Sequence, residues 1–161
     1  MREIQAPNQI KWKVREELIF LAGSIEMGKA ENWQEKIIKL LPKDPIVILN
    51  PRRDDWNSSW EQSIDNPLFS AQVNWELDAM EKAHIILMHF DPKTKSPITL
   101  LELGLFADSG KLIVHCPEGY WRKGNVDIVC QRYKIPQVQT LEELAGRIFR
   151  YSKKIGKPNK Q

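Results

Sequence analysis

Near its beginning the chain carries the run Glu17-Leu18-Ile19-Phe20-Leu21-Ala22, which ends in Gly23-Ser24. A run that is apolar after its first residue is typical of a strand buried on both faces. A helical pattern follows from about Met27 to Leu41, and a second apolar run, Ile46–Leu49, comes after it. This succession of strand, helix and strand is the unit from which parallel α/β sheets are built.

The alternation continues to the end of the chain. Further helices are expected over Pro67–Lys82, from Ser96-Pro97 to about Ser109, over about Val126–Tyr133 and from Leu141 onward, and further strands over His84–Phe90, Lys111–Cys116 and Gln137–Gln139. Ser96 suits the N-cap of its helix and Pro97 the first helical position. Because crossovers between parallel strands are right-handed, the pattern predicts an α/β three-layer αβα sandwich with a five-stranded parallel sheet in the order 2-1-3-4-5.

Length and composition indicate one globular domain. The 161 residues are 42% hydrophobic and 28% charged. We expect a single domain over 1–161 with a core at about 17–152 and peripheral tails at 1–16 and 153–161. The net charge of +3 comes partly from lysines of the C-terminal tail, so no basic face for nucleic acid is expected. No segment is long and apolar enough to span a membrane, and residues 1–13 do not form a secretory signal.

Cysteine and histidine usage argues against a metal site. Cys116 and Cys130 show neither metal-ligand spacing nor a disulfide framework, so we expect two reduced thiols in a cytoplasmic protein. His84, His89 and His115 lie on predicted strands without metal-ligand spacing, and we expect each to be a satisfied core or strand-end residue. No metal and no cofactor is therefore expected.

Ligands of such sheets bind beyond the carboxyl ends of the strands, where the strand order reverses. Gly23-Ser24 closes the first strand there, and its backbone amides can hold a phosphate or a sugar hydroxyl, although a plain turn explains the pair equally well. The loop that follows the second strand offers groups that suit a heteroaromatic base or a phosphate, on Asn50, Arg53, Asp54 and Trp56. A salt-bridged surface loop is the alternative.

Glu102 is the first chemical anomaly of the chain. The segment Pro97–Ala107 is apolar around the whole helix except for Thr99 and this carboxylate, and a helix that is apolar on every side is expected to be buried. No Lys or Arg lies three or four residues away to neutralise the charge, so burial should raise the pKa of Glu102. The alternatives are a glutamate that points to solvent from the rim of the helix, or one that caps a neighbouring loop.

Glu76 is the second anomaly. Together with Phe69, Val73 and Met80 it forms one stripe of the predicted helix, so it interrupts the side that should face the sheet. Its helix precedes the central strand, and the helix of Glu102 follows that strand. Two inward carboxylates there can approach each other, and paired carboxylates with separated pKa values are what glycosyl chemistry needs. An accidental juxtaposition is the alternative.

Five segments, taken in order, resemble the nucleoside 2-deoxyribosyltransferase family, and its 2-deoxyribosyltransferase-like branch in particular. They are Phe20–Ile25, Asn50–Arg53, Gln72–Glu76, Leu101–Gly104 and Arg122–Asp127. The Glu-Leu-Gly motif alone is weak, but the set spans about residues 18–136. The resemblance implies a flavodoxin-like fold, a nucleophile at Glu102, an acid at Glu76 that assists base protonation or sugar orientation, and a homo-oligomer.

Two positions qualify the resemblance. Asn125 matches a residue that, in family members, reaches the sugar hydroxyl of a neighbouring subunit's site, while from the sequence alone it is equally a helix N-cap. Where the transferases have an aspartate six residues before the nucleophile, this chain has Ser96, with Asp91 as the nearest acidic substitute. The preferred nucleobase therefore stays open. Relatives that hydrolyse nucleoside monophosphates make Arg52 or Arg53 a candidate phosphate contact.

These observations predict an enzyme that cleaves or transfers the N-glycosidic bond of a small-molecule nucleoside or nucleotide through a covalent glycosyl-glutamate. Glu102 and Glu76 are the predicted catalytic residues, and the predicted substrate-binding residues are Gly23, Ser24, Asn50, Arg53, Asp54, Trp56, Asp91 and Asn125. The alternatives are a nucleoside monophosphate N-glycosidase and a nucleotide-binding module without turnover. A flavin-binding protein, the third possibility, would be yellow when purified. The sequence does not choose between a base and water as acceptor.

Overall fold

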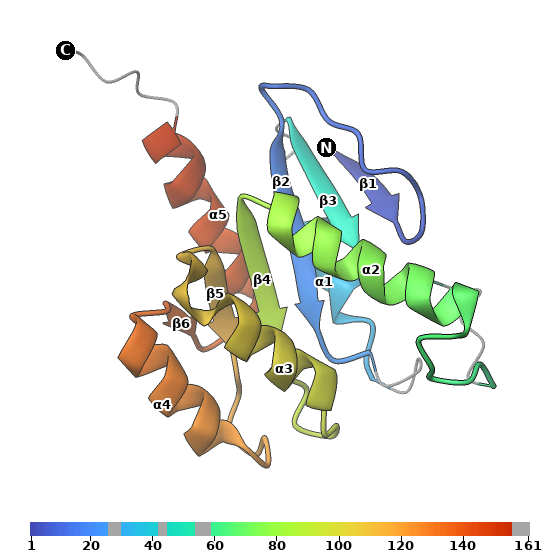
Figure 1. Cartoon of the computed structure of the whole chain (residues 1–161). Helices are drawn as coiled ribbons and strands as arrows, with labels where there is room; N and C mark the ends of the chain where they lie inside the picture. The colour runs from blue at the N-terminus through green and yellow to red at the C-terminus, as the bar shows by residue number, and fades with distance from the viewer. Residues whose placement is uncertain (26–29, 42–44, 54–58, 156–161) are drawn as a thin grey trace.

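The computed structural model describes residues 1–25, 30–41, 45–53 and 59–155. In chain order the elements are β1 (Arg2–Gln5), β2 (Glu17–Gly23), α1 (Trp33–Leu40), β3 (Ile46–Asn50), α2 (Pro67–Lys82), β4 (Ile85–His89), α3 (Pro97–Phe106), the 3-10 helix η2 (Ala107–Ser109), β5 (Leu112–His115), α4 (Lys123–Tyr133), β6 (Gln137–Val138) and α5 (Leu141–Ile155). The strands pair in parallel in one sheet, in the order β1-β3-β2-β4-β5-β6 (Figure 1).

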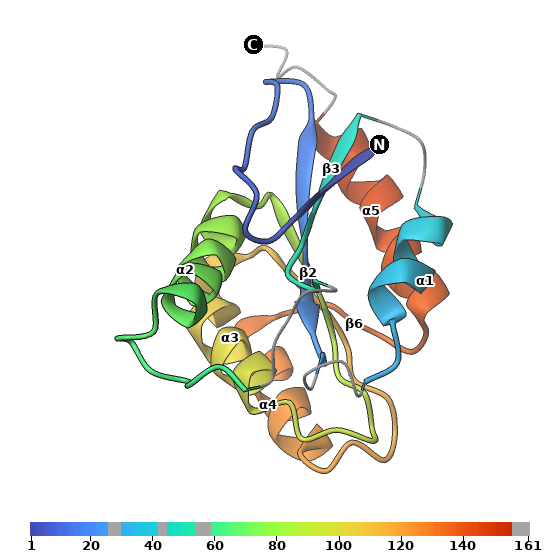
Figure 2. The same cartoon turned by 90° about the vertical axis from the view of Figure 1, so that its right-hand side faces the viewer.

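The predicted three-layer sandwich is confirmed, with one strand more than expected. The strands β3-β2-β4-β5-β6 reproduce the predicted order 2-1-3-4-5, and β1 adds a sixth strand beside β3. Helices α1 and α5 cover one face of the sheet, and α2, α3 and α4 cover the other (Figure 2). The strand order reverses between β2 and β4, so the carboxyl ends of these two strands mark the expected ligand-binding edge.

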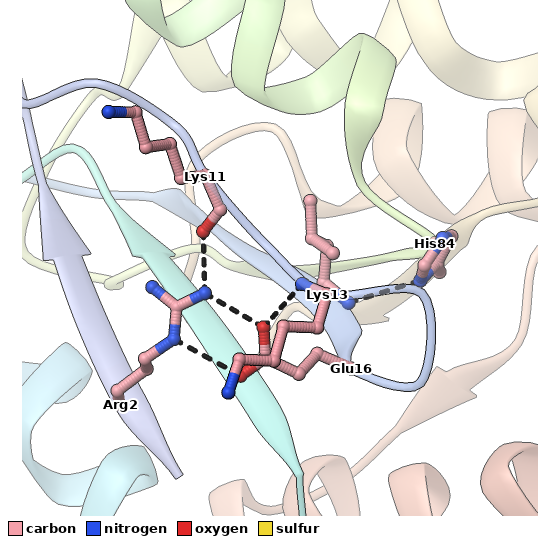
Figure 3. A network of polar contacts seen from close by, with 6 residues as sticks. Arg2, Lys11, Lys13, Glu16 and His84 are labelled. Atoms are coloured by element: carbon pink, nitrogen blue, oxygen red, sulfur yellow. Dashed lines mark hydrogen bonds and ion pairs between the residues drawn. The ribbon is translucent and has the colours of Figure 1, made fainter.

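The segment that forms β1 was expected to belong to a peripheral tail. It pairs with β3 instead, Arg2 opposite Val47, and buries Ile4. The connection to β2 is closed by Glu16, whose carboxylate accepts hydrogen bonds from the Arg2 guanidinium and from the backbone N–H of Lys13 (Figure 3). A four-residue strand with one buried side chain has no period-two pattern to detect.

Alternation along the strands divides the core between the two faces. In β2, Leu18 and Phe20 pack with the core under α2, α3 and α4, while Ile19 and Leu21 pack with Trp33 and its neighbours under α1 and α5. Because successive side chains of a strand point to opposite faces, a residue's parity fixes which helices it meets. The same parity determines which polar residues can share a site.

Several local expectations are corrected by the structure. Helix α1 begins at Trp33, after the N-cap Asn32, and not at Met27; residues 26–29 lie outside the described part of the chain. Ser96 occupies the N-cap of α3 but its side chain makes no capping hydrogen bond. Helix α4 begins at Lys123, so the N-cap alternative for Asn125 is wrong.

Helix α3 is not buried on every side, as its apolar sequence suggested. Its buried residues are Thr99, Glu102 and Leu103. On the adjoining side Ile98, Leu101 and Leu105 are 58–59% exposed, and Ile98 and Leu105 are the neighbours of Glu102 four residues before it and three after it. Glu102 therefore lies on the buried side of a helix that shows an apolar ridge to solvent. Within the described residues, no helix is long and apolar enough to cross a membrane.

Candidate active site

Glu102 projects from the buried side of α3 and is 8% exposed. Burial first, and the charge of Glu76 second, raise the pKa of its carboxyl to about 8. No described residue donates a hydrogen bond to Glu102 or forms an ion pair with it. Buried side-chain oxygens and nitrogens without a partner, in the described part of the chain, are limited to Glu17 Oε1 and Gln34 Nε2. The Glu102 oxygens are not among them, so the carboxylate reaches accessible space.

Glu76 lies on α2, at the edge of the side that packs on the sheet. The buried residues of this helix are Gln72, Trp75, Ala79 and Met80, and Glu76 is half-buried beside them. Burial raises the pKa of Glu76 to about 7, and a hydrogen bond from Gln72 acts in the opposite direction. Because the charge of Glu76 is felt at Glu102, the two helices bring the predicted carboxylates into one electrostatically coupled pair.

Gln72 is a site residue that the sequence reasoning did not single out. It is 2% exposed, and its Nε2 donates to Glu76 Oε1 at 2.8 Å and to the Pro51 carbonyl at 3.1 Å. Its Oε1 accepts from Arg53 Nη1 at 3.3 Å. The available signals were its place at the start of the segment Gln72–Glu76 and its position one helical turn before Glu76, since residues four apart are neighbours on a helix.

The loop after β3 supplies polar groups in two different ways. Arg53 reaches Gln72 and lies over the Trp60 ring, 5.5 Å from its centroid. Asn50 is 5% exposed and holds the loop, because its Oδ1 accepts from Arg52 N at 3.0 Å and its Nδ2 donates to Glu3 Oε1 at 2.7 Å. The Arg52 guanidinium contacts the carbonyls of residues 30 and 31. The predicted contacts Asp54 and Trp56 lie outside the described residues.

Gly23 and Ser24 tie the reversal point of the sheet together. A Cβ on Gly23, whose φ is +147°, would stand 2.3 Å from the His89 carbonyl oxygen, so glycine permits the close approach of β2 and β4. Ser24 N donates to that same oxygen at 3.0 Å. Ser24 is 1% exposed, so its amide is used inside the protein, and a substrate contact for this pair stays a prediction.

The Ser24 hydroxyl belongs to a cluster of three hydroxyl groups. It accepts from Asp91 N at 2.9 Å and lies within hydrogen-bonding distance of Ser96 Oγ and Thr94 Oγ1. Thr94 Oγ1 also lies 2.7 Å from Ser96 Oγ. Ser96 stands where related transferases have an aspartate. Its buried hydroxyl contacts the hydroxyls of Ser24 and Thr94. An aliphatic hydroxyl is too weak an acid to take over a carboxyl's proton transfer.

Asp91 lies on the other face of the sheet, with His89 and His115. An open cavity of about 510 Å³ is lined by Glu31, His89, Asp91, Pro92, Lys93, His115 and Leu141. His89 and His115 are paired across β4 and β5, and their Nδ1 atoms are 2.9 Å apart. The prediction that these histidines are satisfied within the protein agrees with this contact. The Asp91 carboxylate accepts from Lys93 N at 2.8 Å and does not share the cavity wall with Glu76 or Glu102.

Asn125 lies in the first turn of α4 and is exposed. A second cavity, of about 410 Å³, runs beside this helix and is lined by Cys116, Lys123, Asp127, Ile128, Gln131, Gln137, Val138 and Gln139. Neither Asn125 nor the carboxylate pair lines it. Among the described residues, no group of three or more His, Cys, Asp or Glu side chains is arranged to hold a metal ion.

Comparisons with known proteins connect this arrangement to one family. Residues 16–120 match the sequence profile of a family described as "Nucleoside 2-deoxyribosyltransferase like", a segment that contains Glu76 and Glu102 and ends before Asn125. The structure is similar to the crystal structure of a conserved protein from Enterococcus faecalis V583, with a TM-score of 0.58 and 14% identity, over 84% of this chain and 99% of that one. At this identity the likeness concerns the fold alone. The search of curated proteins finds no match.

Proposed function

The chain belongs to the nucleoside 2-deoxyribosyltransferase-like family, and from that premise we propose that it breaks the N-glycosidic bond of a nucleoside or nucleotide through a glycosyl ester on Glu102. Glu76 delivers the proton that the departing base requires. The resulting glycosyl group passes either to a second base or to water. Family membership supports a function on nucleosides, and the individual steps are our proposal.

The observation that carries the proposal is a coupled pair of carboxyls on α2 and α3 without a cation beside them. Both carboxyls have raised pKa values, about 8 for Glu102 and about 7 for Glu76, and the described residues provide no Lys or Arg that pairs with either. Two coupled carboxyls with these pKa values titrate as a unit and hold a single proton between about pH 7 and pH 8. A fold would gain stability by replacing them, so their retention favours a chemical role.

The singly protonated pair supplies both functions that the reaction needs. A Glu102 oxygen attacks the anomeric carbon, and the bond from that carbon to the base nitrogen breaks with its electron pair going to the base. In the reactive arrangement the single proton sits on Glu76, which is the less populated arrangement because the pKa of Glu102 is the higher of the two, and the proton passes from Glu76 to the base nitrogen. The products of this half-reaction are the neutral free base, the glycosyl ester on Glu102 and a Glu76 carboxylate, so the charge of the site is unchanged. Glu76 then accepts a proton from the incoming water or base.

The geometry supports Glu76 as the acid in preference to the other candidates. Ser96 is held in the hydroxyl cluster, and Asp91 lines the cavity on the opposite face of the sheet. Gly23, Ser24 and Asn50 shape this edge of the sheet, while Asn125 remains a proposed contact to sugar.

Arg53 favours a substrate with a phosphate as the second form of the proposal. Its guanidinium lies next to Gln72 and over an indole ring, at the edge of the carboxylate pair. Guanidinium groups bind phosphate oxygens with two parallel hydrogen bonds. A nucleoside monophosphate N-glycosidase would use Arg53 in this way and water as acceptor.

The direct test is incubation of the purified protein with single nucleosides and their monophosphates, with and without a second base, followed by chromatography. We expect release of free base from at least one substrate and none from the Glu102→Gln variant. A new nucleoside in the presence of the second base identifies transfer, and sugar or sugar phosphate identifies hydrolysis. Binding without release from any substrate would support a nucleotide-binding module instead.

We also propose that the protein is a homo-oligomer that uses the exposed ridge of α3. Ile98, Leu101 and Leu105 lie side by side on the helix that carries Glu102, and contiguous exposed apolar side chains favour an interface. Leu101→Lys should then shift the mass measured by light scattering to that of one chain. Both cysteines are free thiols, which fits the cytoplasm that we propose as location.

A further inference from the structure

Both polar atoms of the Gln72 side-chain amide have hydrogen-bond partners. The Pro51 carbonyl can only accept a hydrogen bond and the Arg53 guanidinium can only donate one, so the amide nitrogen must face Pro51 and Glu76 and the amide oxygen must face Arg53. Both hydrogens of Nε2 are thereby used, one on Pro51 and one on Glu76. At 2% exposure the side chain has no solvent with which to exchange these bonds.

This arrangement distinguishes the two oxygens of Glu76. Oε1 accepts the hydrogen bond from Gln72 at 2.8 Å, and no other described residue donates to Glu76. A proton placed on Oε1 would weaken that bond, so the carboxyl carries its proton on Oε2. The same bond opposes the effect of burial on the pKa of Glu76.

We propose that Gln72 is a positioning residue that directs proton transfer in the site to Oε2 of Glu76. The inference rests on the proposed function, because it assigns that transfer to the cleavage of the glycosidic bond. In the first half-reaction the Oε2–H bond breaks and an N–H bond forms on the departing base. In the second half-reaction Oε2 takes a proton back from the acceptor. Arg53, which holds the Gln72 oxygen, links this geometry to the loop that follows β3.

The charged groups that bear on Glu76 are few. Glu102, on α3, repels the negative charge of Glu76. Arg53, in the loop after β3, does not contact Glu76 but donates a hydrogen bond to Gln72, which contacts Glu76. No other charged group acts on Glu76 within the described residues. Removal of the Gln72 amide therefore changes the titration of the pair in one direction, toward higher pH.

The test compares Gln72→Met, which keeps the length of the side chain and removes its hydrogen bonds, with Asn74→Leu as a control. Asn74 is an exposed amide on the same helix, and its Nδ2 donates to the Ser70 carbonyl. We expect Gln72→Met to lower kcat on the order of 10- to 100-fold, with KM nearly unchanged and the pH profile moved to higher pH. Asn74→Leu should keep the kcat and the pH profile of the wild-type protein.

A second measurement separates this inference from the proposed function. Carbon-13 NMR of the glutamate carboxyls follows the titration of Glu76 directly and needs no turnover. The Glu76 signal should titrate at higher pH in Gln72→Met than in the wild-type protein. An unchanged titration overturns the inference even if the enzyme is active. If the wild-type protein releases no base from any substrate, the proposed function fails, while a shifted titration still supports the role of Gln72 in holding Glu76.

Discussion

The molecule buries two pairs of titratable residues, one on each face of the same sheet. The members of one pair repel each other, whereas the members of the other are hydrogen-bonded to each other. Under α2 and α3, Glu76 and Glu102 repel each other and find no cation among the described residues. At the ends of β4 and β5, His89 and His115 satisfy each other through their Nδ1 atoms. Burial shifts the pKa of both pairs toward the neutral form. We assign the pair that satisfies itself to the fold, and our proposal assigns the pair that repels itself to chemistry.

His115 is also affected by the backbone of Gln139. A bond to the Gln139 backbone raises the pKa of His115, which is the effect of an imidazole N–H that donates to a carbonyl. Of the two Nδ1 atoms that face each other, one donates a hydrogen bond to the other. Burial lowers the pKa of both histidines, and that of His89 falls to about 4.

The largest effect on activity is expected when the proposed nucleophile is neutralised. Glu102→Gln keeps the shape of the side chain and removes its charge, so base release should fall at least about a thousandfold. The same change removes a buried charge, so the melting temperature should rise or stay level. Glu81→Gln, at an exposed carboxylate of α2, is the matched control. Turnover near the wild-type rate in Glu102→Gln would place both pairs in the same, structural class.

Removal of the acid should have the next largest effect. Glu76→Gln is expected to lower kcat by roughly 10²- to 10³-fold, since positioned proton transfer contributes on that order. One limb of the pH profile should disappear, because the coupled titration loses a member. Substrates whose base leaves without protonation should be spared. Equal losses for good and poor leaving groups would argue that Glu76 only orients the sugar.

Stability should depend on pH with opposite signs for the two pairs. The glutamates have folded pKa values raised from 4.5, so their contribution is complete below about pH 4.5 and is lost as the pH rises toward 8. His89 has a folded pKa lowered from 6.5, so its contribution is complete above about pH 6.5 and is lost as the pH falls toward 4. Urea unfolding at several pH values should show that Glu102→Gln weakens the first dependence, with the contribution of Glu76 remaining, and that His89→Gln removes the contribution of His89 to the second.

A smaller effect on activity is expected at the histidines. His89→Gln should cost on the order of 1 to 3 kcal/mol of unfolding free energy, because it leaves His115 Nδ1 with a poorer partner in a buried place. Thermal unfolding measures this loss, and kcat should stay within about threefold of the wild-type value. A folded His89→Gln protein without activity would contradict the assignment of this pair to the fold.

The smallest effect should come from the exposed pair at the sheet edge. Glu16 has its pKa lowered to about 2, chiefly by the hydrogen bond from Arg2, yet the Arg2 side chain is 43% exposed. Exposed ion pairs contribute little and are screened by salt. Arg2→Ala should therefore leave activity unchanged and increase hydrogen exchange only near β1. Loss of turnover would show that the N-terminal strand shapes the site.

The sequence predicted the features that break a strong pattern. Glu102 and Glu76 were found because a charge interrupts an apolar helix or stripe, and the sheet order followed from long buried strands. The exposed ridge of α3 was not predicted, because an apolar residue such as leucine or isoleucine does not itself indicate whether it faces the core or the solvent. Gln72 was missed because a glutamine inside a helix is ordinary until its partners are known.

Parity explains the separation of Asp91 from the glutamates. Asp91 follows His89 by two residues, so it faces α1 and α5, while α3 covers the other side of the sheet. Sequence distance from Glu102 alone suggested that Asp91 was the nearest acidic substitute for Ser96. Strand alternation was available in the sequence and, once the strand boundaries are fixed, places the two carboxylates on opposite faces.

The most direct test of the central claim is the mass of the protein after reaction with a slow substrate, a nucleoside whose sugar carries fluorine at C2 to retard the second step. A covalent intermediate predicts a mass increase equal to the fluorinated sugar, located by fragmentation to Glu102 and absent from Glu102→Gln. An adduct on another residue, or release of base by the wild-type protein with no adduct at any time, would contradict the account.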